Sequence, residues 1–327
     1  MPLRSVQILA TGAHLPPVAD AAALAARAGL SAAALEALAG VRRRHAVTTE
    51  TATDLGVGAA RAALDAAGLD AADLDLVLGA CGSRAQPLPG PAVLVHRGLG
   101  LGASGVPAFD VDSTCLSFVS ALDVAALWIA AGRARRVLVV SAEVASAAVD
   151  WRHPESAALF GDGAAAAVLG PSDGEAAILA ARHETFSHAA DWCRVRGGGT
   201  ALPPGAPGAT DADFLFEMDG PRLFRLAAHA LPAFAERLAA EAGLALADLD
   251  LVVPHQASAS TLRLLARRLG VEDRLVSIVE THGNCVAASI PLALDHAVRT
   301  GRLRRGDTAM LIGTSAGVSL GGLVLRY

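Results

Sequence analysis

Three side chains of types used in covalent catalysis stand out in this chain of 327 residues: Cys115, His255 and Asn284. Cys115 opens a helical pattern, where the helix dipole and free backbone N–H groups favour the nucleophilic thiolate. His255 ends a buried strand pattern, at the edge where α/β sheets gather their sites. Asn284 precedes a second helical pattern. A nucleophile beside two neutral donors suits covalent chemistry in which an oxyanion or enolate must be held.

Each of these residues also has a purely structural interpretation. A lone cysteine is often a small buried hydrophobe, a histidine can be a satisfied core residue, and an asparagine before a helix is a common N-cap. Cys285, directly after Asn284, is expected to point into its helix and to be structural. The order and placement of all three residues, and no single one of them, favour a shared site.

The composition excludes several classes of protein. A hydrophobic content of 53% supplies a large core, and a net charge of −5 gives no reason to expect a nucleic acid partner. The four cysteines form no CxxC pair and no zinc spacing, so we expect no metal and free thiols in a reduced, cytoplasmic compartment. Neither a secretory signal nor a membrane span is expected, because the apolar stretches are short or interrupted.

The chain repeats its own pattern. Residues 66–83 and 241–258 share ten of eighteen positions, and each segment passes from a helix end at Gly68 or Gly243 into a short apolar strand. A glycine just past a helix end typically adopts the left-handed cap. This similarity predicts two halves of like architecture.

Two further correspondences appear in the same order. The basic segments 132–136 and 301–305 each precede an apolar strand, and Cys115 and Cys285 each open an alanine-rich segment. The repeat therefore predicts that Cys115 and the Asn284-Cys285 pair lie at the openings of equivalent helices, which a pseudo-twofold axis would bring face to face.

Helical and strand patterns alternate along the chain, which predicts mainly parallel sheets covered by helices. The expected halves are residues 1–172 and 173–327, and the Gly- and Pro-rich stretch 197–213 is expected to be a loop that connects them and to serve as a lid. The predicted helices are 52–67, 116–131, 221–242, 258–269 and 287–300. The predicted strands are 74–80, 137–142, 164–169, 249–253 and 308–313.

With these residues identified, the sequence resembles the β-ketoacyl-acyl carrier protein synthase III family of the thiolase superfamily over nearly its whole length. The resemblance implies the thiolase fold, an α/β architecture of duplicated halves layered α-β-α-β-α, and a homodimer that acts on acyl thioesters without a metal or other cofactor. The matching stretches are GVRRRH (40–45), 52–80, CLSFVSALDVA (115–125), LFGDGAAAAVL (159–169), PHQAS (254–258), HGNCVAASIPLALDHAV (282–298) and GTSAGVSLGGLVLRY (313–327).

The resemblance also implies a role for each site residue. Cys115 would take an acyl group from a thioester. His255 and Asn284 would hold the enolate formed when a malonyl-acyl carrier protein type of thioester loses CO2. The backbone N–H groups of Cys115 and Ala316 would form the oxyanion hole. The implied reaction is a decarboxylative Claisen condensation that gives a β-ketoacyl thioester.

The same resemblance places Leu88, Phe160 and Thr314 in the substrate pocket, with Leu88 reaching into the partner subunit. Relatives that condense two long acyl thioesters carry a glutamate base at that position, so Leu88 argues against their reaction. The degradative thiolases fit less well, because the loop 313–322 lacks their second cysteine.

Two features of the sequence bear on its partners: the arginines of one predicted helix, and the positions where the chain departs from the family pattern. The arginines on the helix 258–269 are expected to meet an acidic acyl carrier protein, or else to form a solvated helix face; they are Arg263, Arg267 and Arg268. The family's tryptophan and arginine that grip coenzyme A fall on Ala34 and Leu38, and a third family arginine falls near Pro154, next to Arg152. These departures favour a carrier-bound or shorter thioester donor.

Two other functions remain open from the sequence. One is an acyltransferase that moves an acyl group from a carrier to a small-molecule nucleophile in a secondary pathway. The other is a non-catalytic subunit that supports an active homologue in a heterodimeric ketosynthase. Release of CO2 would favour condensation over the first, and failure of the purified protein to be acylated by any thioester would favour the second.

Overall fold

A computed structural model describes residues 5–172 and 174–327, and it shows two large sheets that follow one plan, beside a small two-stranded sheet of β7 and β8. The first sheet has the strand order β1-β5-β4-β2-β3, and the second has the order β6-β11-β10-β9. The helices are α1 (Ala21–Arg27), α2 (Ala32–Ala39), α3 (Ala52–Ala67), α4 (Pro91–Gly98), α5 (Ser117–Ala130), α6 (Pro154–Leu159), α7 (Gly220–Glu241), α8 (Ala259–Leu269), α9 (Val279–His282) and α10 (Ser289–Arg299). The strands are β1 (Val6–His14), β2 (Leu76–Gly79), β3 (Ala108–Asp110), β4 (Val137–Glu143), β5 (Gly163–Pro171), β6 (Ala177–Thr185), β7 (Cys193–Val195), β8 (Phe216–Met218), β9 (Leu251–Pro254), β10 (Thr308–Ser315) and β11 (Ser319–Arg326).

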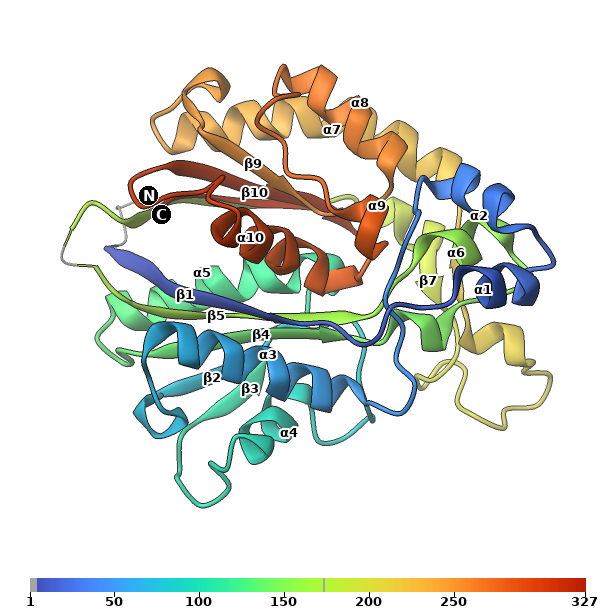
Figure 1. Ribbon diagram of the computed structural model, residues 1–327, viewed down its shortest axis with the longest axis horizontal. Coiled ribbons are helices and arrows are strands. Elements are labelled where there is room, and N and C mark those ends of the chain that lie inside the picture. Colours follow the sequence, from blue (N-terminus) through green and yellow to red (C-terminus); the bar gives the residue numbers. More distant parts are fainter. Residues whose placement is uncertain (1–4, 173) are drawn as a thin grey trace.

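The layers follow the order α-β-α-β-α, as the resemblance implied (Figure 1). Helix α3 covers the outer face of the first sheet, and α7 covers the outer face of the second. Helices α5 and α10 lie between the sheets, and each contacts both: α5 packs on β4 and β11, and α10 packs on β1 and β9. The middle layer therefore belongs to both halves.

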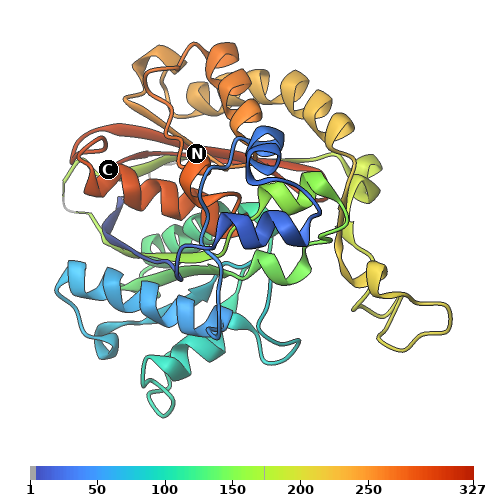
Figure 2. The same cartoon turned by 45° about the vertical axis from the view of Figure 1, so that its right-hand side comes forward.

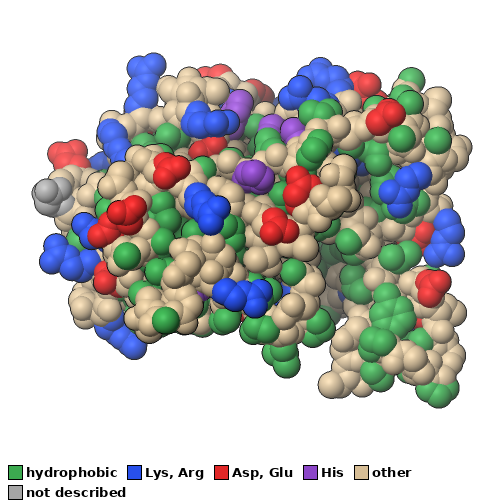
Figure 3. Space-filling model, turned by 60° about the horizontal axis from the view of Figure 1, so that its bottom comes forward, with side chains coloured by type: hydrophobic (Ala, Val, Ile, Leu, Met, Phe, Trp, Pro, Cys, Tyr) green, Lys and Arg blue, Asp and Glu red, His purple; other side chains and the backbone are tan. Residues whose placement is uncertain are grey.

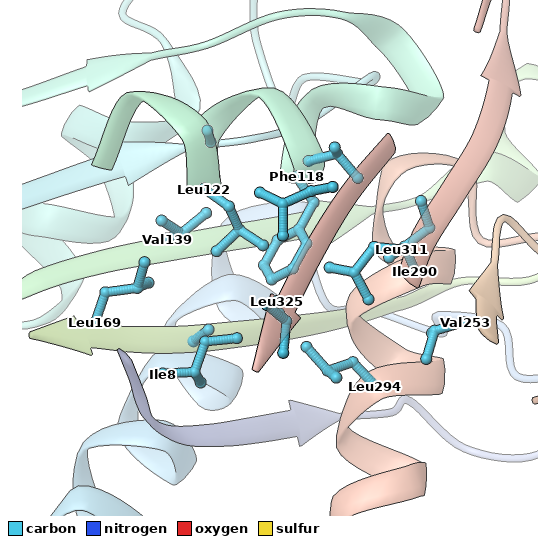
Figure 4. Packing of buried hydrophobic residues seen from close by; sticks show 14 of the residues in the cluster. Ile8, Phe118, Leu122, Val139, Leu169, Val253, Ile290, Leu294, Leu311 and Leu325 are labelled. Carbon is cyan, nitrogen blue, oxygen red and sulfur yellow. The ribbon is translucent and has the colours of Figure 1, made fainter. Parts of the chain in front are cut away.

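The middle layer is apolar because its helices are buried on nearly all sides. Figure 4 shows Phe118 and Leu122 of α5 beside Ile290 and Leu294 of α10, with strand side chains of both sheets around them. Phe118, Leu122, Ile290 and Leu294 are all 0% exposed. This cluster contains residues of both sheets and joins the halves.

The expectation of mainly parallel sheets is wrong. Strands β4 and β5 pair antiparallel, as do β10 and β11, while β2–β4 and β9–β10 are parallel. Strands β10 and β11 are joined by three residues only, and such a tight connection cannot join parallel neighbours. The added outer strands β1 and β6 are antiparallel as well.

The stretch 197–213 does not connect the two halves. Strand β6 already pairs with β11 of the second sheet before this stretch begins, so the stretch lies inside the second half, between β7 and β8. It extends away from the main body (Figure 2), and Arg196 pairs with Asp213 across its base. The predicted boundary at 172–173 adjoins residue 173, which lies outside the described residues.

The helix-end glycines behave as predicted. Gly68 ends α3 at φ 64°, and Gly243 follows α7 at φ 75°. Thr51 and Asp54 form a capping box at the start of α3, which satisfies two of its free N–H groups. No single helix in residues 5–172 and 174–327 is long and apolar enough to cross a membrane. Helices α1 and α2, which meet at a bend, reach the necessary length and apolar composition only when they are taken together.

Candidate active site

Two turns of the same construction lead into the middle-layer helices. In the first, Asp112 Oδ1 accepts a hydrogen bond from Thr114 N at 2.9 Å, and Thr114 has φ 50°. In the second, Asn284 Oδ1 accepts one from Val286 N at 2.9 Å, and Val286 has φ 47°. Positive φ is rare for a threonine and strained for a valine. Both turns therefore hold the backbone in a conformation that the side-chain bond must stabilise.

The first serine of each helix closes its turn. Ser117 Oγ accepts from Ser113 N at 2.9 Å, and Ser289 Oγ accepts from Cys285 N at 3.0 Å. The two sets of bonds match at a separation of 172 positions. The predicted equivalence of Cys115 and Cys285 is therefore wrong by two residues, because the loops before the turns differ in length.

In the corrected register, Cys115 corresponds to Ala287, and Asn284 corresponds to Asp112. Cys285 corresponds to Ser113 and is 1% exposed, with its Sγ 3.6 Å from the carbonyl oxygen of His282. The nucleophile candidate and the carboxamide thus occupy different positions of one repeated turn.

Cys115 lies in the 3-10 turn Thr114–Leu116, directly before α5. The backbone N–H of Ala316, in the loop between β10 and β11, lies close enough to the thiol to lower its pKa. Burial nevertheless raises the pKa of the Cys115 thiol above its ordinary value, with the nearby Cys193 and Glu143 adding to the rise. The thiolate expected from the helix dipole is thus outweighed by desolvation in the resting protein.

His255 follows β9, and its backbone N–H donates to Ile312 O at 2.8 Å. Its Cβ would lie 2.6 Å from a Cβ at Gly313, whose missing side chain lets the imidazole approach β10. Burial lowers the pKa of His255 to about 4, so the ring is neutral at pH 7. Among the described residues, its Nδ1 has no hydrogen-bond partner.

Asn284 has a fixed carboxamide orientation. Its Oδ1 accepts from Val286 N and lies 3.4 Å from Ser289 Oγ, so the oxygen faces the turn and the Nδ2 donor faces away from it. Asn284 also forms an isolated β-bridge with Phe160. The structural role as a cap and the chemical role as a donor are therefore compatible, because they use different atoms.

Close backbone packing brings these elements together. A Cβ on Gly82 would lie 2.8 Å from Val286 Cγ1 and 3.4 Å from the carbonyl carbon of Thr114, so Gly82 fits between the two turns. A Cβ on Gly313 would lie 3.4 Å from Leu116 Cδ2 as well as close to His255. The elements that carry Cys115, His255 and Asn284 therefore converge at the meeting of the halves.

The predicted pocket residues lie in different surroundings. Phe160 is 8% exposed and packs edge-to-face on Phe216 with ring centroids 5.0 Å apart. Thr314 is half-buried in β10, two residues after Ile312, which pairs with Pro254, the neighbour of His255. Leu88 is 82% exposed, on the loop after β2, so this chain alone does not bring it to the other two.

The predicted carrier-binding arginines are all exposed on α8; they are Arg263, Arg267 and Arg268. Beside them, Phe224 of α7 and Leu264 of α8 line a shallow hollow. Basic and acidic side chains are interspersed on the face shown in Figure 3, where a hollow also separates the main body from a projecting lobe. Arg152 forms an ion pair with Asp150, 2.9 Å between Nε and Oδ1.

Glu143 is the functional candidate that sequence reasoning missed. It ends β4 at 0% exposure, and its carboxylate accepts from Gly82 N at 2.5 Å, from Ser83 N at 2.9 Å and from the Ser83 hydroxyl. The backbone N–H of Ala287 faces the carboxylate closely enough to lower its pKa. Burial raises the pKa of Glu143 to about 7, against the effect of these donors. The available signal was a carboxylate at the end of an otherwise apolar strand, VLVVSAE.

A second missed residue is Cys193 on β7, whose thiol is close enough to Cys115 to affect its pKa. No group of three or more His, Cys, Asp or Glu side chains within the described ranges is arranged to hold a metal ion. The groups that the structure brings towards the site are a thiol, a neutral imidazole, a carboxamide and backbone N–H groups.

Comparisons with known proteins agree on one group. Residues 109–187 match the family model for 3-oxoacyl-[acyl-carrier-protein] synthase III, and residues 239–327 match that for its C-terminal part. The chain is 36% identical to the β-ketoacyl-[acyl-carrier-protein] synthase III of Neisseria meningitidis serogroup C, with 99% of this chain and 100% of that protein covered.

Solved structures give the same result. The 3-oxoacyl-[acyl-carrier-protein] synthase III of Aquifex aeolicus superimposes with a TM-score of 0.89 at 31% identity, covering 98% of this chain and 100% of that one. The priming β-ketosynthase of the R1128 polyketide biosynthetic pathway superimposes with a TM-score of 0.90 at 31% identity, covering 99% of this chain and 96% of that one.

Proposed function

The chain belongs to the 3-oxoacyl-[acyl-carrier-protein] synthase III family of condensing enzymes, and we propose that Cys115, His255 and Asn284 carry out its decarboxylative Claisen condensation. The observation that carries the residue assignment is the convergence of the two turns and of the end of β9 around Gly82 and Gly313. The comparisons favour condensation over ester formation and over a non-catalytic subunit.

The first half-reaction loads the enzyme. The Cys115 sulfur attacks the carbonyl carbon of an acyl thioester, and the C–S bond to the donor thiol breaks. The proton of Cys115 ends on the departing thiol. The N–H groups of Cys115 and Ala316 hold the oxyanion, and each such donor supplies roughly 3–4 kcal/mol in the transition state.

The second half-reaction makes the carbon–carbon bond. A malonyl-type thioester loses CO2, and the electron pair of the broken bond forms an enolate. The imidazole of His255 and Nδ2 of Asn284 donate to the enolate oxygen. The enolate carbon attacks the acyl-Cys115 carbonyl, the C–S bond breaks, and the thiolate of Cys115 leaves the β-ketoacyl thioester. A histidine with a pKa of about 4 suits this role, because it is a neutral donor that needs no proton from solvent.

The donor and partners are part of the proposal. With Ala34 and Leu38 at the coenzyme A positions, and Arg152 engaged by Asp150, we assign the donor to a carrier protein or a short thioester. The acidic carrier would bind the exposed arginines of α8. A homodimer would bury Leu88 in the partner's pocket, and the cytoplasmic protein would need no cofactor beyond its thioester substrates.

Intact-protein mass spectrometry with a panel of acyl-coenzyme A and acyl-carrier donors tests this assignment. We expect an acyl adduct on the wild type and none on Cys115→Ala. We expect His255→Ala to be acylated but to release no CO2 from a malonyl thioester. Equal acylation of Cys115→Ala and the wild type would refute the nucleophile.

A further inference from the structure

The buried carboxylate of Glu143 lies where the two halves meet. It accepts hydrogen bonds from the segment after β2, at Gly82 and Ser83, and the backbone N–H of Ala287, at the opening of α10, faces it. The first segment belongs to the first half and Ala287 belongs to the second. One side chain thus joins the halves beside the site, and the reaction described above gives it no role.

The repeat shows which residue of the second half is equivalent to Glu143. In the first sheet Val137 of β4 pairs with Leu76, and in the second sheet Ala309 of β10 pairs with Leu251. Val137 and Ala309 are therefore equivalent. By the same register, Glu143 at the end of β4 corresponds to Ser315 at the end of β10. The corrected register of the turns makes Ala287 the counterpart of Cys115. The N–H of Ala287 is therefore the counterpart of the N–H assigned to the oxyanion hole.

The two equivalent positions are used in opposite ways. At Cys115 the N–H is the one assigned to the oxyanion, and the strand end carries the short Ser315, whose hydroxyl bonds to Ala316 O at 3.0 Å. At Ala287 the same kind of N–H faces the Glu143 carboxylate, closely enough to lower the pKa of that carboxyl. A carboxylate that accepts several N–H and O–H donors satisfies them as a bound anion would.

We propose that Glu143 is a positioning residue that fills the pseudo-symmetric counterpart of the oxyanion hole and thereby fixes the Asn284 turn against the Cys115 turn. This inference rests on the proposed function. Gly82 transmits the constraint, because it is bonded to Glu143 and fits between Thr114 and Val286. Without the carboxylate, Gly82 and Ser83 would lose their common acceptor and the N–H of Ala287 would lose the anion that it faces. Buried N–H groups without acceptors move to find one.

The consequence differs between the half-reactions. Acylation uses Cys115 and the N–H groups beside it, whereas decarboxylation also needs Nδ2 of Asn284 at the enolate. A displacement of one turn by a fraction of an ångström therefore weakens decarboxylation more than acylation. Misplacement of about 1 Å can cost 100-fold in rate.

The variant Glu143→Gln tests the proposal, because it keeps the shape but places an N–H₂ group among donors. We expect Cys115 acylation within about threefold of the wild type, and decarboxylation of a malonyl thioester slower by about 10- to 100-fold. The milder Ser83→Ala, which removes one donor to the carboxylate, should change the same ratio in the same direction by less. It serves as the folded alternative if Glu143→Gln does not accumulate.

A rescue experiment separates positioning from general destabilisation. Glu143→Ala should recover decarboxylation with formate but not with chloride at equal ionic strength, since formate supplies two oxygens to the same donors. The matched control is Asp295→Asn, a carboxylate on α10 that is 2% exposed and accepts from Thr11 Oγ1 at 2.9 Å. It should leave the ratio of the two half-reactions unchanged.

Two results would overturn the proposal. One is an equal decrease of both half-reactions in Glu143→Gln and Ser83→Ala, and the other is failure of formate to rescue a folded Glu143→Ala. A wild-type protein that is not acylated by any donor would instead refute the proposed function, so the two failures are distinguishable.

Discussion

The turn at Asp112–Ser117 and the turn at Asn284–Ser289 have the same backbone and different chemistry. Each uses an Asx side chain, a residue at positive φ and a closing serine in the same places. The first carries the thiol, and the second carries the carboxamide. The comparison teaches that the duplicated backbone supplies rigid positions, while substitutions at equivalent positions divide one reaction between the halves.

The largest expected effect comes from making the second turn resemble the first. Asn284→Asp keeps the oxygen that accepts from Val286 N, but it loses the Nδ2 donor and adds a negative charge facing the enolate. We expect decarboxylation to fall by about 10²–10³-fold while Cys115 is still acylated. CO2 release and intact mass measure the two steps.

The reciprocal change, Asp112→Asn, is the control for this prediction. It keeps the acceptor for Thr114 N in a residue outside the proposed machinery, so both half-reactions should stay near wild-type rates. Decarboxylation at the wild-type rate by Asn284→Asp would show that the two turns do not differ in the way proposed.

A smaller effect is expected where the turns are alike. Ser117→Ala and Ser289→Ala each leave one backbone N–H without its acceptor, at Ser113 and at Cys285. Each substitution should lower the free energy of unfolding by about 1–3 kcal/mol. Urea denaturation measures the change, and a loss confined to one of the two variants would contradict the structural equivalence of the turns.

The smallest effect concerns pH, at a position where the halves differ. His255 and Ala80 are equivalents, since their N–H groups donate to Ile312 and Val140 at the same distance of 2.8 Å. With the pKa of His255 lowered to about 4 by burial, the imidazole remains a neutral donor, so its protonation should not reduce decarboxylation between pH 8 and pH 5. A loss of rate with an apparent pKa near 6.5 in the wild type, absent from His255→Asn, would contradict this.

The same histidine affects stability in a defined direction. The unfolded chain binds a proton near pH 6.5 that the folded His255 does not bind until about pH 4. The free energy of unfolding should therefore decrease as pH falls from about 6.5 to 4, and His255→Asn should show a weaker decrease. Ala80, the equivalent residue in the first half, has no titratable side chain and does not contribute to the pH dependence of the free energy of unfolding.

The sequence predicted the helices around the site well. Helix α3 was predicted at its observed bounds, and α5, α7, α8 and α10 within two residues, because their apolar periodicity and glycine ends are strong local signals. The duplication was also visible in the β2 and β9 segments. Local pattern therefore sufficed for the elements that carry Cys115, His255 and Asn284.

Features that depend on long-range contacts were not predicted from the sequence. The register between the turns was wrong by two residues, since loops of different length precede them and sequence spacing cannot show which residues share a conformation. Positive φ at Thr114 and Val286 was unexpected, because no local preference predicts it for these residue types. Glu143 was missed because its partners at Gly82 and Ala287 are distant in the sequence.

The middle layer has a consequence for any attempt to divide the protein. Because α5 contacts β11 and α10 contacts β1, a fragment ending after β5 would leave the apolar faces of α5 and of its own sheet open to water. Each fragment alone should aggregate. Co-expressed fragments cut between β5 and β6 should reassemble, so this protein is suited to fragment complementation with the nucleophile and the carboxamide supplied by separate chains.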